Sequence, residues 1–201
     1  AALAMKRRQS SMHPVLAILQ GGDRRSIGKS NEVVSMVLKE PPLFDALFSG
    51  MFMDDPLIRM RSADAVEKVT AIHPEYLASY KKALLTSLAK VEQPEVRWHV
   101  APMLARLPLS KSEQAAVINA LTGYLNDRSS IVKTFAMQAL YDLAERYKAL
   151  RPIALAHIQE RVAIGTPAMK ARGRKLLATL NRFATASTRT GFSAGVPKPP
   201  G

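Results

Sequence analysis

Apolar and small residues recur at helical spacing through the middle of the chain, in a pattern that repeats after 38, 36 and 37 residues. The copies align on four pairs of an apolar residue and a cation: Ile58-Arg59, Val96-Arg97, Val132-Lys133 and Met169-Lys170. The fourth, eighth and eleventh residues after each apolar anchor fall on one stripe of an α-helix, with small residues where neighbouring helices must approach closely. They are Ser62, Val66 and Val69; Val100, Leu104 and Leu107; Ala136, Leu140 and Leu143; and Gly173, Leu177 and Leu180. A fixed period of this length predicts stacked copies of one helical unit.

A second helix is expected before each of these. A turn that contains Pro, Asp or Gly precedes each aligned helix, and proline is tolerated at a helix start because its missing N–H has no helical partner there. The partner helices are predicted at residues 43–52, 75–89, 112–125 and 151–163. An incomplete first unit over 15–20 and 31–39 fits the register poorly, as is typical of a terminal capping repeat. No stretch alternates with period two, so the sequence predicts an all-α fold of four to five antiparallel helix pairs and no sheet.

The turn acid, the Val/Ile-Arg/Lys pair and the Ala and Leu residues at helical spacing resemble the HEAT-repeat family over about residues 41–181. The resemblance implies a right-handed α-solenoid, although the period is slightly shorter than that of HEAT or armadillo repeats. HEAT-like solenoids act as scaffolds, transport receptors, nucleic-acid binders and, rarely, enzymes, so the architecture alone does not give the activity. We expect the helical domain to cover residues 12–182, between disordered tails at 1–11 and 183–201, which lack an apolar period.

Composition narrows the classes of function. The 201 residues are 47% hydrophobic, enough for a domain with a core, and none is cysteine, which excludes disulfides, thiolate metal sites and a cysteine nucleophile. No apolar stretch is long enough to span a bilayer, so we expect a soluble, cytoplasmic protein. The four histidines never occur at metal-ligand spacing, and no catalytic triad order or cofactor fingerprint is present. We therefore expect no metal, no cofactor and no enzymatic activity.

The net charge of +13 is concentrated in one part of the chain. Residues 12–145 carry fifteen basic and fifteen acidic side chains, whereas residues 146–182 carry nine basic and one acidic. The densest cluster, near a predicted helix N-terminus where the macrodipole disfavours cations, is Lys170, Arg172, Arg174 and Lys175. A phosphate-bearing partner or an acidic protein surface would favour it, and a solubilising terminal cap is the alternative. We treat it as a candidate anion-binding site.

The cation that follows each anchor admits two interpretations. It could contact phosphates, one per repeat, or it could pair with a turn acid of its own or a neighbouring repeat. Suitable turn acids are Asp54, Asp55, Glu95 and Asp127. The structural pairing is favoured, because these acids stand at the turns in three of the four repeats.

A second stripe follows the third and tenth positions after each anchor, where HEAT-like pairs usually face the concave surface. The candidate partner-binding residues on or beside it are Arg61, Lys68, Trp98, His99, Arg106 and Phe135. Asp64 and Asp142 interrupt its basic character, so a solvated face that binds nothing fits the pattern as well. Trp98, the only tryptophan, is suited to packing between repeats or to stacking on a base or a peptide.

Two hypotheses about function follow. The first is a non-enzymatic scaffold or adaptor that binds a protein partner with an acidic surface on its concave face. The alternative is a nucleic-acid-binding protein, which the net charge favours. The alkylpurine DNA glycosylases built from HEAT-like repeats are similar to this chain in architecture and basic bias, but none of their catalytic residues can be placed on this sequence.

Overall fold

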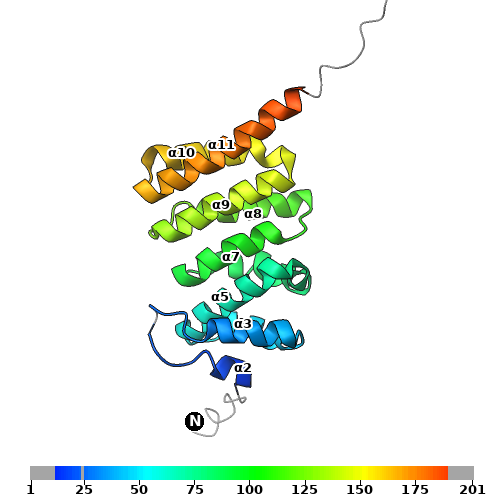
Figure 1. Ribbon diagram of the computed structural model, residues 1–201, viewed down its shortest axis with the longest axis vertical. Coiled ribbons are helices and arrows are strands. Elements are labelled where there is room, and N and C mark those ends of the chain that lie inside the picture. The colour runs from blue at the N-terminus through cyan, green and yellow to red at the C-terminus, as the bar shows by residue number, and fades with distance from the viewer. Residues whose placement is uncertain (1–11, 24, 190–201) are drawn as a thin grey trace, which may run out of the picture. The chain divides into compact units, whose positions relative to one another are not determined.

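The computed structural model describes residues 12–23 and 25–189, and side chains within them as far as residue 180. All regular structure in this part of the chain is helical, with ten α-helices and four short 3-10 helices, which confirms the all-α prediction. Contacts divide the chain into two compact units, one ending at Ala136 and one beginning at Met137. Figure 1 shows the helices in chain order.

The first unit contains most of the predicted helix pairs. Its main helices are α2 (Pro14–Ala17), α3 (Ser30–Lys39), α4 (Leu43–Ser49), α5 (Pro56–Ile72), α7 (Pro94–Arg106) and α8 (Lys111–Tyr124). A 3-10 helix η1 (Gly50–Phe52) continues α4. Helices α3, α5 and α7 lie side by side (Figure 1). The starts follow the sequence rules: Asp55 caps α5 ahead of Pro56, and Ser110 and Glu113 form a capping box on α8.

The single helix predicted over 75–89 is wrong. This segment is broken into η2 (Pro74–Tyr80), α6 (Lys81–Leu85) and η3 (Leu88–Lys90). α6 ends at Thr86, whose hydroxyl and amide both donate to the carbonyl of Lys82, at 2.8 and 3.1 Å. The buried positions remain Leu77, Leu84 and Leu88, so the segment still packs on the rest of the unit.

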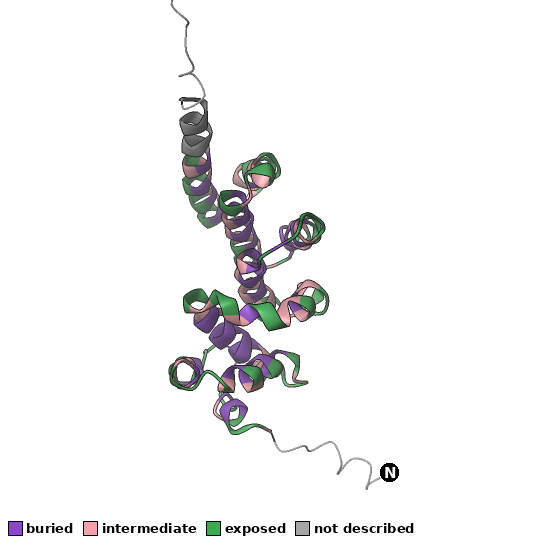
Figure 2. Cartoon of the chain, turned by 90° about the vertical axis from the view of Figure 1, so that its right-hand side faces the viewer, coloured by how far each residue is buried: buried purple, intermediate pink, exposed green. Residues whose placement is uncertain are grey.

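The predicted apolar stripe forms the core. The anchors Ile58, Val96 and Val132 are fully buried, and the stripe residues that follow them are buried with them. Buried and exposed positions alternate around each helix (Figure 2). Ser62 is fully buried, and a side-chain carbon added at Gly50 would collide with its hydroxyl. The small residues on the stripe therefore permit close helix approach, as the sequence predicts.

The second unit begins within α9 (Ser130–Arg146). It continues through η4 (Lys148–Leu150) into α10 (Arg151–Ile164) and α11 (Pro167–Arg189). Helices α10 and α11 pack on each other. Gly173 is buried at their contact, where a side-chain carbon would collide with Val162 and lie 2.8 Å from the methyl group of Met137. The fourth stripe is buried at Met169 and Leu180, whereas Leu177 is partly exposed.

The predicted tails fall mostly outside the described residues. This holds for residues 1–11 and 190–201. The expected boundary at 182 lies inside α11, whose backbone remains helical to Arg189, since the first glycine after Gly173 is Gly191. None of the described helices is both long and apolar enough to cross a bilayer.

Candidate functional site

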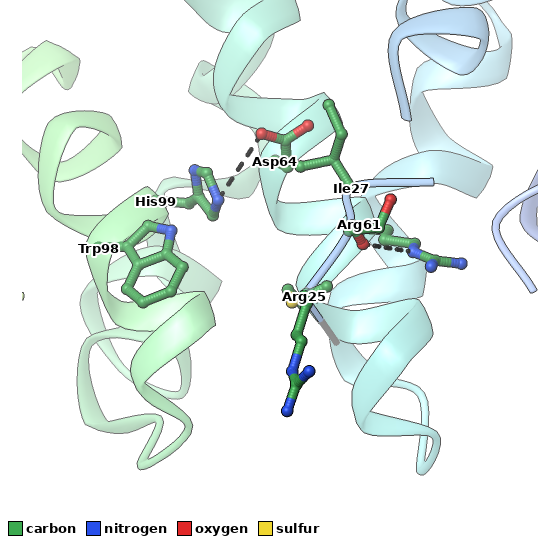
Figure 3. Close-up of a pocket in the computed structure, with 8 residues that line it drawn as sticks. Arg25, Ile27, Arg61, Asp64, Trp98 and His99 are labelled. Carbon is green, nitrogen blue, oxygen red and sulfur yellow. Dashed lines mark hydrogen bonds and ion pairs between the residues drawn. The ribbon is translucent and has the colours of Figure 1, made fainter. Parts of the chain in front are cut away.

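A cleft of about 290 Å³ opens in the first unit between α5, α7 and the loop that precedes α3. Its walls are drawn in Figure 3. It is lined by Arg25, Ser26, Ile27, Met60, Arg61, Asp64, Trp98 and His99. Three of the six predicted partner-binding residues, Arg61, Trp98 and His99, thus meet at one place.

Arg61 has a different role from the one predicted. It is 2% exposed, so it forms part of the cleft wall without offering its hydrogen-bond donors to a partner. Its guanidinium donates to four backbone carbonyls of the preceding loop: Leu19 at 2.7 Å, Gly21 at 2.5 Å, Asp23 at 3.2 Å and Ser26 at 3.2 Å. Arg61 therefore holds the loop against α5, because its five donors match several carbonyls at once.

Glycines allow the loop to wrap around this side chain. Gly21, Gly22 and Gly28 have φ angles of 79°, 79° and 53°, which favour glycine. A side-chain carbon on Gly28 would lie 2.6 Å from the central guanidinium carbon of Arg61. No carboxylate among the described residues pairs with Arg61, so its positive charge is solvated by backbone dipoles alone.

Asp64 lines the cleft from α5 and is 5% exposed. It accepts hydrogen bonds from the Ser30 hydroxyl and, at 2.7 Å, from the Lys68 ammonium. Lys68 also donates to the side-chain oxygen of Asn31 at 2.8 Å. The predicted binding residue Lys68 is thus committed to contacts within the protein, and it compensates the charge of the buried carboxylate.

His99 packs beside Asp64, with its Nε2 atom 3.8 Å from a carboxylate oxygen (Figure 3). Burial lowers the pKa of His99, although Asp64 and Glu67 act in the opposite direction. Its Nδ1 atom is buried and has no hydrogen-bond partner in the described part of the protein. The ring is therefore neutral near neutral pH and serves as part of the cleft wall.

Trp98 and Arg25 supply the uncommitted polar groups of the cleft. Trp98 is half-buried on α7, edge-on to His99 with 5.8 Å between ring centroids. Arg25 is exposed on the loop, on the opposite side of the opening (Figure 3). Neither the indole N–H nor the Arg25 guanidinium bonds to any described residue. The apolar side chains of Ile27 and Met60 complete the lining.

The remaining predicted stripe residues lie outside the cleft. Arg106 pairs with the Glu67 carboxylate at 2.5 Å and also donates to the Glu67 carbonyl at 3.0 Å, which ties α7 to α5. Phe135 is 38% exposed on α9. Sequence reasoning did not identify Ile27 and Met60 as candidates, and Ile27 lies on a loop without a periodic pattern.

The recurring cation links consecutive repeats in the first unit. Arg97 pairs with Asp127 at 2.6 Å, across to the turn before α9, which confirms the structural interpretation at this position. Arg59 donates to the Gln93 side chain in the turn before α7 and to the carbonyl of Met53 in the turn before α5, both at 2.9 Å, and neither partner is a carboxylate. Burial raises the pKa of the Asp127 carboxyl, but the hydrogen bonds from the Ser129 amide and the Arg97 guanidinium outweigh burial, so the pKa lies below its ordinary value.

The predicted anion-binding cluster lies on the exposed side of α11 in the second unit. Arg172, Arg174 and Lys175 are exposed and Lys170 is partly so. Arg172 donates to the side-chain oxygen of Gln138, whereas the other three side chains bond to none of the described residues. The described residues also hold no group of three or more histidine, cysteine or acidic side chains that would suit a metal ion.

No protein-family model matches the chain, and no curated protein matches it. Among solved structures, it is similar to the crystal structure of an engineered protein from the Northeast Structural Genomics Consortium. The TM-score is 0.56 and the identity 18%, over 90% of this chain and 86% of that one. A likeness at this identity concerns the helical fold and not the activity.

Proposed function

We propose that the chain is a HEAT-like helical-repeat scaffold that binds a protein partner and carries out no catalysis. The observation that carries the proposal is the cleft beside Trp98. It combines an apolar lining with two uncommitted donors, on Trp98 and Arg25, whereas its other charged groups are engaged within the protein. Such a surface suits recognition of a side chain from another protein.

The links between repeats support the solenoid part of the proposal. In α-solenoids each repeat contacts its neighbours, and the helix pairs stack into a right-handed superhelix with a concave binding face. Arg59 and Arg97 each bond to the turn inside the next repeat, just before its second helix, and α5 packs on α7. We propose that all four pairs stack in this way and that the cleft opens on the concave face.

The committed state of the ionisable groups favours binding over catalysis. A general acid or base needs a polar atom within reach of a substrate. Asp64 is buried and already holds Ser30 and Lys68, and Arg61 is fully used by the loop. His99 is neutral and turns its unpaired Nδ1 atom into the protein interior.

A peptide-display selection on the immobilised protein tests the proposal. Selected peptides are expected to bind the wild type and to lose binding when Ile27, which is 40% exposed in the cleft, is changed to serine. Ile131→Ser is the matched control, because Ile131 is 48% exposed on α9 and lies outside the cleft. A selection that enriches no binding peptide, or peptides that ignore Ile27→Ser, would overturn the proposal.

Nucleic-acid binding is the second candidate, supported by the exposed cations of α11. It predicts that labelled duplex or single-stranded DNA or RNA binds with a steep salt dependence in fluorescence anisotropy. Changing Lys170, Arg172, Arg174 and Lys175 together to glutamine should weaken binding and flatten the salt slope. A control variant neutralises four exposed lysines of the first unit: Lys39, Lys82, Lys90 and Lys111. Equal losses in both variants would refute a site on α11, and background base release from alkylated DNA would remove a glycosylase activity.

A further inference from the structure

The cleft is small and mostly apolar. At about 290 Å³ it lies at the small end of the range of roughly 300–1,000 Å³ that small-molecule pockets occupy. Ile27, Met60 and the Trp98 ring give it apolar walls, and Met60 is buried at 5% exposure. Transfer of an aliphatic or aromatic side chain from water to this apolar lining would be favourable.

The charges around the cleft favour a negative neighbour for that anchor. Arg61 contributes a buried positive charge without a carboxylate partner, and Arg25 contributes an exposed one. The one carboxylate in the lining, Asp64, is offset by Lys68 at 2.7 Å. Just outside the lining, Asp23 accepts from the backbone amide of Arg25 at 2.9 Å, and Glu67 is paired with Arg106. The cleft as a whole is therefore positive, even though residues 12–145 are balanced.

The uncommitted donors specify the chemistry further. Trp98 on α7 and Arg25 on the loop lie on opposite sides of the opening (Figure 3). The indole offers one N–H and the guanidinium offers a fork of donors that matches a carboxylate. Both donors call for an acceptor. Of the acceptors in the lining, the Ser26 hydroxyl accepts from the Gly28 amide at 3.0 Å, one oxygen of Asp64 holds Ser30 and Lys68, and the other oxygen of Asp64 lies 3.8 Å from His99 Nε2.

We infer that the cleft binds an acidic peptide segment, with a large apolar side chain on Trp98, Ile27 and Met60 and a neighbouring carboxylate on Arg25. This inference rests on the proposed function and adds the chemistry of the partner. A peptide fits better than a nucleic acid, because strand binding uses several aromatic platforms along a basic groove, whereas here a single tryptophan stands beside two aliphatic side chains. Electrostatic attraction to the guanidinium groups of Arg25 and Arg61 speeds association and favours acidic partners over neutral or basic ones.

Trp98 supplies a direct measurement, since it is the only tryptophan of the chain and its emission reports on the cleft. Peptides from the display selection, made without tryptophan, are titrated while this emission and the heat of binding are recorded. We expect selected peptides to carry Asp or Glu beside Leu, Ile or Phe. Replacing the acids with Asn and Gln should weaken binding about tenfold, the loss of one charge-assisted contact.

Variants of the loop test the role of Arg25. Arg25→Gln should weaken binding of the acidic peptide about tenfold. It should leave binding of the peptide with Asn and Gln in place of its acids unchanged. The matched control is Lys29→Gln, an exposed cation on the same loop outside the lining, which should leave both unchanged. Both substitutions are at exposed positions, so the fold is preserved.

The outcomes separate this inference from the proposed function. If neutral apolar peptides are selected, or Arg25→Gln leaves the acidic peptide unaffected while Ile27→Ser abolishes binding, the acidic specificity is wrong and the protein-binding function stands. If no peptide binds, both fail. If a single-stranded oligonucleotide displaces the peptide and itself depends on Ile27, the occupant is a nucleic acid and the inference is overturned.

Discussion

Replacing Arg61 with methionine should release the loop between α2 and α3 while α5 stays helical. Methionine retains an unbranched apolar stem on α5 but removes all four bonds to the carbonyls of Leu19, Gly21, Asp23 and Ser26. Hydrogen bonds from a charged donor contribute about 1.5–3 kcal/mol each in mutational series. Against them stands a desolvation penalty of several kcal/mol for a buried guanidinium. We therefore expect the free energy of unfolding of the first unit to fall by about 3 kcal/mol.

The assay combines urea unfolding, followed by Trp98 fluorescence, with hydrogen exchange of the loop peptide. In Arg61→Met, amides of the loop before α3 should lose nearly all of their protection, whereas those of α5 and α7 should lose only the part that corresponds to the fall in global stability. Arg61→Lys should be intermediate, because an ammonium has three donors and no planar fork. Arg25→Met, an exposed change on the same loop, is the control and should leave stability within about 0.5 kcal/mol.

Two results would refute this reasoning. One is unchanged protection of the loop in Arg61→Met, since the carbonyl bonds would then not be what orders it. The other is equal loss of protection across the loop, α5 and α7, which would mean that Arg61 supports the whole unit and not the cleft wall.

Three further predictions concern other parts of the fold. Burial lowers the pKa of His99 below its ordinary value of 6.5, so the unfolded chain takes up the proton more readily and stability should fall as the pH drops below about 6.5. His99→Gln should remove that part of the pH dependence in urea unfolding between pH 7 and 5. Gly173→Ala should lower the free energy of unfolding by about 1–3 kcal/mol through overpacking. Gly123→Ala, in open space on α8, should raise it by about 0.5–1 kcal/mol. Thermal unfolding followed by circular dichroism compares the two variants, and equal effects would contradict the packing argument. A double-mutant cycle on Arg97 and Asp127 should give a coupling of about 1–2 kcal/mol, because the carboxylate is 5% exposed, and a coupling near zero would mean that this link does not hold the repeats together.

The helix pattern could be predicted from the sequence because packing imposes it. Each of these helices buries one face, and apolar residues must recur at helical spacing to fill it. The period of apolar residues therefore locates α5, α7, α9 and α11. The segment 74–90 departs from the prediction because its apolar residues keep a helical spacing while two 3-10 helices interrupt the α-helical backbone. Periodicity gives the buried face of a segment but not the regularity of its hydrogen bonds.

The cleft could be predicted only in part. Trp98 and His99 follow an anchor at regular positions, so the stripe identified them. Arg61 occupies the same stripe, yet its partners are carbonyls from 35 to 42 residues earlier, which no local pattern reveals. The available signal was the run of glycines at 21, 22 and 28, which indicates a loop that wraps closely around something.

The dependence of the loop on Arg61 also sets an order of events during synthesis. The carbonyl of Leu19 receives its donor from a residue made 42 positions later. At about 5–20 residues per second, that interval lasts roughly 2–8 s on the ribosome. Throughout this interval the loop before α3 lacks the Arg61 guanidinium, so α5 must emerge before that loop is ordered. The loop before α3 is thus made earlier than α5 and ordered only after it.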